Sequence, residues 1–260
     1  MRFLQLSTQN RVATITLDNR AKRNALEPAL REELAEAIAW VRDDGEIRAL
    51  ILTGAGEHFS SGGDLKNIAG AGLDGEGWRL RMQHAHRWVH DLVTLEKPVI
   101  AAIDGVAYGA GFSLALAADF ILATPRARFC MSFMRVGFVP DLGAFYTLPR
   151  VVGPQRAREL MLSGRELDGE EALRLGIAME LLPPEQLMDR ARAIAQSMTH
   201  ASAAVVSMVK RTLAVGGPEL ATLLEMESNA QAVAAGTPAH KEAVQRFLDK
   251  RPPAFQWPAK

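Results

Sequence analysis

Two short apolar runs constrain the fold of this chain more than any other feature. They are RALILTG, residues 48–54, and KPVIAAIDG, residues 97–105. Each run is almost unbroken in β-branched and small apolar residues, whereas a strand with one solvent-exposed face alternates apolar and polar side chains. Burial on both faces is typical of a sheet that lies between helices. The two runs therefore predict an α/β protein.

The segments before and between these runs supply further elements. Residues 3–7 and 11–18 have the pattern of a β-hairpin with its turn at Gln9-Asn10. Pro28 is suited to the first turn of a helix, because its missing N–H has no partner to lose there. Residues 78–95 also have the apolar spacing of a helix. Strand and helix patterns thus alternate along the first part of the chain.

The second half of the chain has a different character. From residue 154 onward the pattern is mainly helical and is interrupted by Gly and Pro. Strand–helix alternation followed by a helical tail is typical of an α/β core with an appended helical region. We predict a core over residues 1–197 and a C-terminal helical region over residues 198–260.

Composition excludes several classes of protein. Lys plus Arg and Asp plus Glu number 30 each, so the formal net charge is zero and gives no sign of nucleic acid or acidic lipid as a partner. No apolar run reaches the roughly 18 residues that a membrane helix needs, and the N-terminus lacks the apolar block of a signal peptide. We expect a soluble, cytoplasmic protein that binds neither nucleic acid nor membrane.

The residues that most often bind metals form no clear metal-binding pattern. His86 and His90 are four residues apart in a predicted helix, but the sequence offers them no evident third ligand. Cys130 is the only cysteine, which excludes an internal disulfide and suits a reducing compartment. Between Phe129 and Met131 it is better interpreted as a small core residue than as a nucleophile. We expect no metal site.

Glycine-rich loops follow both apolar runs. EHFSSGGDL, residues 57–65, comes after the first, and GVAYGAGFSLALAAD, residues 105–119, comes after the second. Neither is a Walker A loop or a dinucleotide fingerprint. One such loop is explained equally well by tight packing of a helix on a strand. Two of them favour a pair of backbone N–H donors that bind one oxygen, an oxyanion hole.

One carboxylate stands in an apolar turn. In RVGFVPDLGAF, residues 135–145, Asp141 is surrounded by apolar residues, a Pro and a Gly. A buried carboxylate without partners is costly, so such a residue either caps a helix or has an altered proton affinity that the protein uses. An N-cap for the helix predicted to begin at LGAFYTL is the simpler reading of the residues alone.

Several blocks together resemble the enoyl-CoA hydratase/isomerase (crotonase) superfamily. They are ALILTGAGEHFSSGGDLKNI, KPVIAAIDGVAYGAGFSLALAAD, LPRVVGPQRARELMLSGRELDGEEALRLGIAMELLP and AHKEAVQRFLDKRPPAF, and they span nearly the whole chain. The resemblance implies a crotonase-like spiral of ββα units with a C-terminal helical region used to form trimers or hexamers. It also implies an acyl-CoA thioester as substrate and no cofactor beyond the coenzyme A that this substrate carries.

The resemblance assigns roles to individual residues. The backbone N–H groups of Gly63 and Ala110 would bind the thioester oxygen and stabilise an enolate. The C-terminal helical region would complete the CoA site through Phe247 and Lys250, across a subunit boundary. The residues expected to contact substrate are Lys22, Arg23, Ala25, Ser61, Gly62, Asp64, Leu65, Lys66, Tyr108, Phe133, Phe138, Leu142, Phe247 and Lys250.

Departures from the family pattern point to one branch. Hydratases of the family carry two glutamates that handle water, and this chain has Ser113 and Phe133 at those positions. The acid of the family's isomerases lies eight residues beyond the second, which is Asp141 here. The segment looks most like Δ3,Δ2-enoyl-CoA isomerases and 1,2-epoxyphenylacetyl-CoA isomerases of phenylacetate breakdown. Asp141 would then be the base, in an apolar pocket of Phe138, Leu142 and Phe145.

Other activities stay open at this point. Another residue could handle water, as in an enoyl-CoA hydratase. The carboxylate could also attack the acyl group, as in the hydrolase and dehalogenase branches of the superfamily. A catalytically weak acyl-CoA-binding homologue is a further possibility, because both hydratase acids are missing. The acyl group itself is not predicted by the sequence.

Overall fold

The computed structural model describes residues 1–259, and its first element is the expected hairpin. Strands β1 (Leu4–Gln9) and β2 (Val12–Leu17) pair antiparallel. The turn lies one residue later than expected, because Asn10 and Arg11 take the positive φ angles of 50° and 66°. Asn tolerates this left-handed conformation better than most residues. In β2 every second residue is fully buried, as the alternation predicts.

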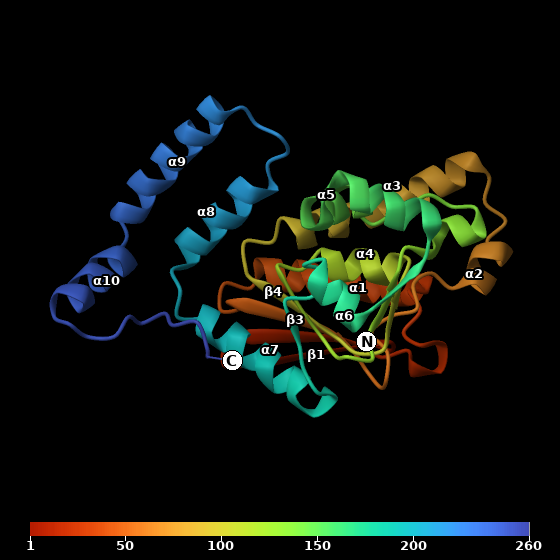
Figure 1. The fold of residues 1–260 in the computed structure, drawn as a ribbon, viewed down its shortest axis with the longest axis horizontal. Helices are drawn as coiled ribbons and strands as arrows, with labels where there is room; N and C mark the ends of the chain where they lie inside the picture. Colours follow the sequence, from red (N-terminus) through yellow and green to blue (C-terminus); the bar gives the residue numbers. More distant parts are fainter. Residues whose placement is uncertain (260) are drawn as a thin grey trace.

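A six-stranded sheet forms the centre of the molecule (Figure 1). Its order is β1-β2-β3-β4-β6-β9, and from β2 onward neighbouring strands are parallel. The added strands are β3 (Ala49–Gly54), β4 (Val99–Ile103), β6 (Phe120–Ala123) and β9 (Glu180–Leu181). The apolar runs at residues 48–54 and 97–105 therefore form two adjacent central strands, β3 and β4.

Both faces of the central strands are covered, as their composition predicts. In β3, Leu50 and Leu52 belong to the larger apolar core with helix α1 (Pro28–Asp43). Ala49 and Ile51 point the other way, into a second core with helix α7 (Pro184–Met198). Helices thus flank the sheet on both sides, and the prediction of an α/β protein is confirmed.

A smaller sheet and several helices complete the core. The three-stranded sheet has the order β5-β7-β8, with β5 (Val106–Tyr108), β7 (Arg128–Cys130) and β8 (Glu166–Asp168). The remaining helices of this part are η1 (Arg20–Lys22), α2 (Leu65–Gly70), α3 (Gly75–Val93), α4 (Ala110–Leu116), η2 (Ser132–Val136), α5 (Ala144–Ser163) and α6 (Gly169–Arg174). Cys130 is buried, and its thiol donates to the carbonyl oxygen of Gly164 at 3.0 Å.

The C-terminal helices extend away from the layered core (Figure 1). They are α8 (Ala203–Ala214), α9 (Leu220–Ala235) and α10 (Pro238–Leu248), and none of the three contains a buried residue. We call them the C-terminal arm. Within residues 1–259, no helix of the arm or the core has the length and apolar character needed to cross a membrane.

The chain returns to the core after the arm. Arg190 of α7 donates to the carbonyl oxygens of Pro258 and Ala259 at 3.1 and 2.6 Å. The rings of Trp257 and Phe120 pack with their centroids 5.2 Å apart. The arm is therefore a loop of helices held to the core at both of its ends, with α7 on one side and the tail on the other.

Candidate active site

The two glycine-rich loops lie against each other. The backbone N–H of Ser60 donates to Val106 at 2.9 Å, and the N–H of Tyr108 donates to Ser60 at 3.0 Å. Gly62 has a φ of +84°, and a Cβ placed on it would lie 2.4 Å from the carbonyl oxygen of Tyr108 and 3.3 Å from the nitrogen of Ala110. Only glycine fits this position, because both the conformation and the space exclude a side chain.

This packing brings two unpaired N–H groups onto adjacent loops. Among the hydrogen bonds of residues 1–259, neither the N–H of Gly63 nor that of Ala110 has an acceptor. Ala110 is the first residue of α4, where intrahelical partners for N–H groups are lacking. Gly109 before it has a φ of 49°. Two free donors of this kind can bind a carbonyl oxygen and stabilise negative charge on it.

The segment before α1 supports the first loop. The N–H of Ser61 donates to Arg23 at 2.8 Å, and the N–H of Leu26 donates to Gly62 at 2.8 Å. The hydroxyl of Ser61 donates to the carbonyl of Lys22 at 3.0 Å. Of the residues expected to contact substrate, Lys22, Arg23, Ala25, Ser61 and Gly62 are therefore brought together here.

Asp64 and Lys22 hold the end of the same loop. The Asp64 carboxylate caps α2 by accepting the N–H groups of Lys66 and Asn67 at 2.9 and 3.1 Å. It also pairs with Lys22 at 2.7 Å, and this bond is the main reason that its pKa falls to about 2. The side chains of Leu65 and Lys66 are exposed. The anion at position 64 thus stabilises the backbone next to Gly63.

The Asp141 turn is strained and leaves its carboxylate without a partner. Leu142 is buried with a φ of 48°, an uncommon conformation for a branched side chain, and Gly143 follows with a φ of 81°. Helix α5 begins after Gly143, without a capping hydrogen bond from any side chain. The Oδ1 atom of Asp141 is buried and has no hydrogen-bond partner within residues 1–259. Asp141 is therefore not a helix cap.

The surroundings of Asp141 change its proton affinity. Burial raises its pKa to about 6, and the positive charges of Arg31 and Arg81 oppose this shift. Neither arginine is predicted from the sequence as part of the site. Helical spacing could have indicated them. Arg31 lies on the same helix face as the buried Leu34, and Arg81 lies on the same face as the buried Ala85.

Aromatic residues link the Asp141 turn to the second loop. Phe133 is buried, and its Cζ atom would be 3.9 Å from a Cβ on Gly109. Phe138 is partly exposed and packs against Trp78 with ring centroids 5.4 Å apart. The expectation for Phe145 is wrong. Its side chain, in the first turn of α5, is 61% exposed and so does not help to enclose a buried carboxylate.

The hydroxyl of Ser113 is not available for water chemistry. Ser113 is fully buried in α4, and its Oγ donates to the carbonyl of Gly109 at 3.3 Å. The hydroxyl of Tyr108, a residue expected to contact substrate, donates to Glu166. Burial and this bond raise the pKa of Tyr108 to about 12. The two positions of the missing glutamates thus hold a bonded hydroxyl and, at Phe133, an apolar ring.

Phe247 and Lys250 lie apart from the other residues expected in the site. Phe247 belongs to α10 of the arm and is 81% exposed, and Lys250 follows that helix. Figure 1 shows α10 well removed from the core helices. Within one chain these residues do not meet Asp141, so their expected role depends on a second copy.

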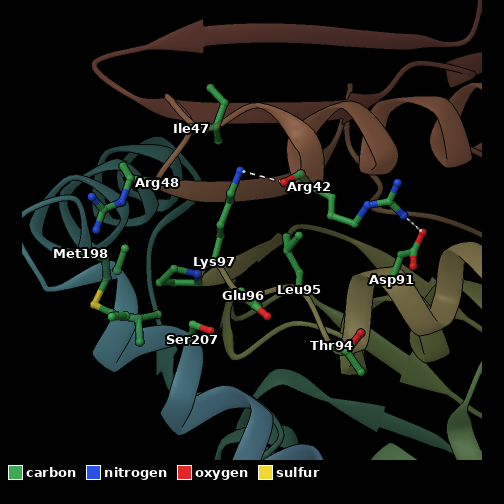
Figure 2. Close-up of a pocket in the computed structure, with 15 residues that line it drawn as sticks. Arg42, Ile47, Arg48, Asp91, Thr94, Leu95, Glu96, Lys97, Met198 and Ser207 are labelled. Atoms are coloured by element: carbon green, nitrogen blue, oxygen red, sulfur yellow. Dashed lines mark hydrogen bonds and ion pairs between the residues drawn. The ribbon is translucent and has the colours of Figure 1, made fainter. Parts of the chain in front are cut away.

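A cavity of about 470 Å³ lies at the opposite end of the sheet (Figure 2). Ile47 and Pro98, which line it, precede β3 and β4, whereas the glycine-rich loops follow the carboxyl ends of those strands. The cations that line it already have partners within the chain. Lys97 donates to carbonyls at the end of α1, and Arg42 pairs with a carboxylate of α3. Arg48 donates to a carbonyl between α7 and α8. This cavity therefore belongs to the junction of core and arm.

Comparisons with known proteins identify the class. The family model described as enoyl-CoA hydratase/isomerase matches residues 7–258. The chain is 34% identical to 1,2-epoxyphenylacetyl-CoA isomerase of Escherichia coli over 98% of both chains. It is 38% identical to carnitinyl-CoA dehydratase of Escherichia coli over 80% of this chain and 78% of the relative. A crystal structure of an enoyl-CoA hydratase/isomerase from Cupriavidus metallidurans superimposes with a TM-score of 0.93 at 42% identity, covering 100% of this chain and 98% of that one.

The chain belongs to the enoyl-CoA hydratase/isomerase family. It has the crotonase fold, and its activity on CoA thioesters is of the hydratase/isomerase type. The relatives include both an isomerase and a dehydratase, so the reaction of this chain has to be argued from its own site.

Proposed function

We propose that this protein is an acyl-CoA isomerase that converts 3-enoyl-CoA into 2-trans-enoyl-CoA, or shifts a double bond in a related ring substrate. The observation that carries the proposal is the carboxylate of Asp141: its Oδ1 atom is buried without a hydrogen-bond partner, and burial raises its pKa to about 6. A base with a pKa near the working pH transfers protons in both directions efficiently. A double-bond shift needs such a group, because the same proton must leave one carbon and return to another.

The reaction follows from the three groups of the site. The N–H groups of Gly63 and Ala110 bind the thioester oxygen and make the C2 protons acidic. The Asp141 carboxylate removes one proton from C2, and the electron pair spreads over the dienolate to C4. Asp141 then returns the proton to C4, which leaves the double bond between C2 and C3. The reaction is redox-neutral and adds no atom, so it needs no cofactor beyond the CoA of the substrate.

The absence of water-handling groups supports an isomerase over a hydratase. Phe133 presents an apolar ring, and the hydroxyl of Ser113 is bonded to a backbone carbonyl. Neither side chain can activate water at neutral pH. Attack of Asp141 on the acyl group is the second candidate, favoured by the same unpartnered carboxylate, and it predicts a covalent acyl- or aryl-enzyme rather than an isomer.

We further propose that the arm joins copies into a trimer or a hexamer. The arm has no buried residue in a single chain, and its apolar side chains include Leu213 and Leu220, which are 74% and 70% exposed. In such an assembly Phe247 and Lys250 would approach the CoA of a neighbouring copy. Lys22, Arg23 and Lys66 would face the nucleotide of the CoA bound to their own chain.

The test compares isomerisation with hydration. We expect the protein to convert 3-hexenoyl-CoA into 2-trans-hexenoyl-CoA, and to hydrate crotonyl-CoA much more slowly. Asp141→Asn should lower isomerisation by about 10²–10⁴-fold, since an amide cannot accept and return the proton. Binding of a saturated acyl-CoA should persist, because it depends on the glycine-rich loops.

Asp168→Asn is a matched control. Asp168 caps α6 through the N–H of Glu171 at 2.8 Å, and Asn caps helices about as well as Asp. Its activity should remain near that of the unmodified protein. Hydration without any isomerisation, or an Asp141→Asn variant with near-normal isomerisation, would contradict the proposed function. An intermediate attached to Asp141, detected by mass spectrometry, would favour the second candidate.

A further inference from the structure

Two arginines from different helices share the surroundings of Asp141. Arg31 lies on α1 and Arg81 on α3. The charge of each arginine acts on the Asp141 carboxylate, and the charge of Arg81 acts on Arg31. The exposed carboxylate of Glu32, next to Arg31 in sequence, also acts on Arg31. Two positive charges therefore act on the proposed base.

Both arginines lie on the side of their helix that carries the buried residues. Arg31 precedes the buried Leu34 and Ile38 by three and seven residues, and Arg81 precedes the buried Ala85 and Val89 by four and eight. Residues at these spacings lie on one side of a helix. A Cβ on Gly143, in the Asp141 turn, would lie 3.4 Å from the Cγ1 of Val89. The face of α3 that carries Arg81 thus packs against that turn.

Neither guanidinium has a direct partner among the described residues, although the charge of Asp141 acts on both and that of Glu32 acts on Arg31. Burial is the main reason that the pKa of Arg31 falls to about 10, and burial also lowers the pKa of Arg81. Within residues 1–259, neither side chain forms an ion pair or donates a hydrogen bond. A guanidinium has five N–H donors, and leaving them partly desolvated without an acceptor is costly. Such a pair is suited to an anion that comes from outside.

Aromatic rings lie beside one of the two arginines. The guanidinium of Arg81 lies over the ring of Trp78, 4.9 Å from its centroid, and Trp78 packs on Phe138. Stacking of this kind holds the planar guanidinium in one orientation. The Asp141 turn therefore combines an apolar surface with two arginines, which suits a ligand that has an apolar middle and an anionic end.

We propose that Arg31 and Arg81 select acyl groups that carry a carboxylate at the end remote from the thioester. The inference rests on the proposed function, because it places the acyl group at the Asp141 turn. Guanidinium groups bind carboxylates through paired hydrogen bonds, which are charge-assisted and directional. The alternative is that the two arginines only adjust the proton affinity of Asp141 and do not contact substrate.

The test uses two thioesters of the same shape. One is the mono-CoA thioester of 3-hexenedioic acid, and the other is 6-methyl-3-heptenoyl-CoA, in which an isopropyl group replaces the carboxylate. We expect the unmodified protein to favour the first in kcat/KM. Arg31→Gln and Arg81→Gln should each lower that preference by about 10- to 100-fold, as for the loss of a hydrogen bond to a charged group.

The ratio of the two substrates separates selection from other effects. A variant that is partly unfolded, or whose Asp141 has a shifted pKa, loses activity on both thioesters alike, so the ratio does not change. Arg87→Gln is the matched control, because Arg87 lies on the exposed side of α3. It should leave the ratio as it is. Equal preference for the two thioesters in the unmodified protein, or an unchanged ratio in both Gln variants, overturns the inference.

Binding measurements keep this inference separate from the proposed function. The saturated ligands adipoyl-CoA and 6-methylheptanoyl-CoA can be titrated by calorimetry, with no turnover required. Tighter binding of adipoyl-CoA that is lost in Arg31→Gln supports carboxylate selection even if no isomerisation is found. Isomerisation of the neutral thioester without any binding preference leaves the proposed function intact and removes the inference.

Discussion

The core and the C-terminal arm differ in which groups they bury and which they leave without a partner. The core buries complete side chains on both faces of its sheet, from Leu50 on one side to Ile51 on the other. Its one buried side-chain nitrogen or oxygen atom without a hydrogen bond, among the described residues, is Oδ1 of Asp141. The arm buries no residue, although Leu213 and Leu220 are large and apolar. One region leaves a polar atom unpaired, and the other leaves apolar surface uncovered.

The difference indicates two kinds of missing contact. A desolvated carboxylate in a well-packed turn is expected where the group takes part in chemistry, and the strained Leu142 beside it fits that reading. Apolar surface spread over three helices is typical of an interface between chains. The proposals above therefore assign a small ligand to the core and a protein surface to the arm. Each of the following predictions tests one side of this contrast.

The largest effect is expected for charges placed on the arm. If the arm forms an interface, the double variant Leu213→Asp, Leu220→Asp buries unpaired carboxylates, at about 3–5 kcal/mol each. Light scattering should then show chains of 28.3 kDa instead of a multiple of that mass. Far-UV circular dichroism should remain unchanged, because neither side chain packs on the core.

A charge on an exposed leucine of the core serves as the control. Leu162 of α5 is 61% exposed, close to the leucines of the arm. Leu162→Asp should leave the mass of the assembly unchanged. A concentration-independent monomer for the unmodified protein, or dissociation by Leu162→Asp alone, would remove the contrast between the two regions.

The next largest effect concerns the contact between the two glycine-rich loops. Gly62→Ala places a methyl group 2.4 Å from the carbonyl oxygen of Tyr108 at a φ of +84°, so one loop must move. Displacing Gly63 or Ala110 from the thioester oxygen should lower kcat by about 10²–10³-fold, as for the loss of one oxyanion donor. Steady-state kinetics with a 3-enoyl-CoA measures this.

Gly70→Ala provides the comparison for this loop variant. Gly70 ends α2, close in sequence to the loop, and a Cβ there meets nothing within 4 Å. This substitution should leave kcat near that of the unmodified protein. If Gly62→Ala retains full activity, the two N–H groups do not act together on the substrate.

Much of the fold follows from local sequence patterns. The hairpin, the two central strands and the helix opened by Pro28 are all confirmed, because each depends on residue periodicity or on one conformationally restricted residue. The turn at Asn10-Arg11 differs by one residue from the prediction. The exact position of such a turn depends on which residues adopt a positive φ, and neighbouring residues can have similar preferences for it.

The candidate site is only partly predictable for a physical reason. Asp141 stands out as a lone carboxylate in an apolar turn, and its Oδ1 atom is buried in the structure. Arg31 and Arg81 could not be assigned to it, since α1 and α3 meet the turn only in the tertiary structure. Phe145 was expected in the pocket because it is near Asp141 in sequence, but its side chain is largely exposed. Closeness to Asp141 in the sequence does not show whether a side chain lies beside it in the structure.

The smallest effect, and the one specific to the core, is a gain in stability when Asp141 is neutralised. An ordinary aspartate has a pKa of 3.8, and burial raises that of Asp141 to about 6 in the folded protein. The folded state therefore binds this proton more tightly than the unfolded state. As pH rises from about 4 to about 6, the folded state loses stability, and above that window the full penalty remains.

Asp141→Asn removes this ionisation and should stabilise the protein at pH 7, by up to about 3 kcal/mol. At pH 4 and below, Asp141 is protonated in the folded state, so the gain should vanish there. Urea unfolding of both proteins at pH 4, 5, 6 and 7 measures the difference. A variant less stable than the unmodified protein at pH 7 would mean that the Asp141 carboxylate stabilises the fold. The Oδ1 atom of Asp141 would then have a structural role rather than a catalytic one, and the contrast between the core and the arm would not hold.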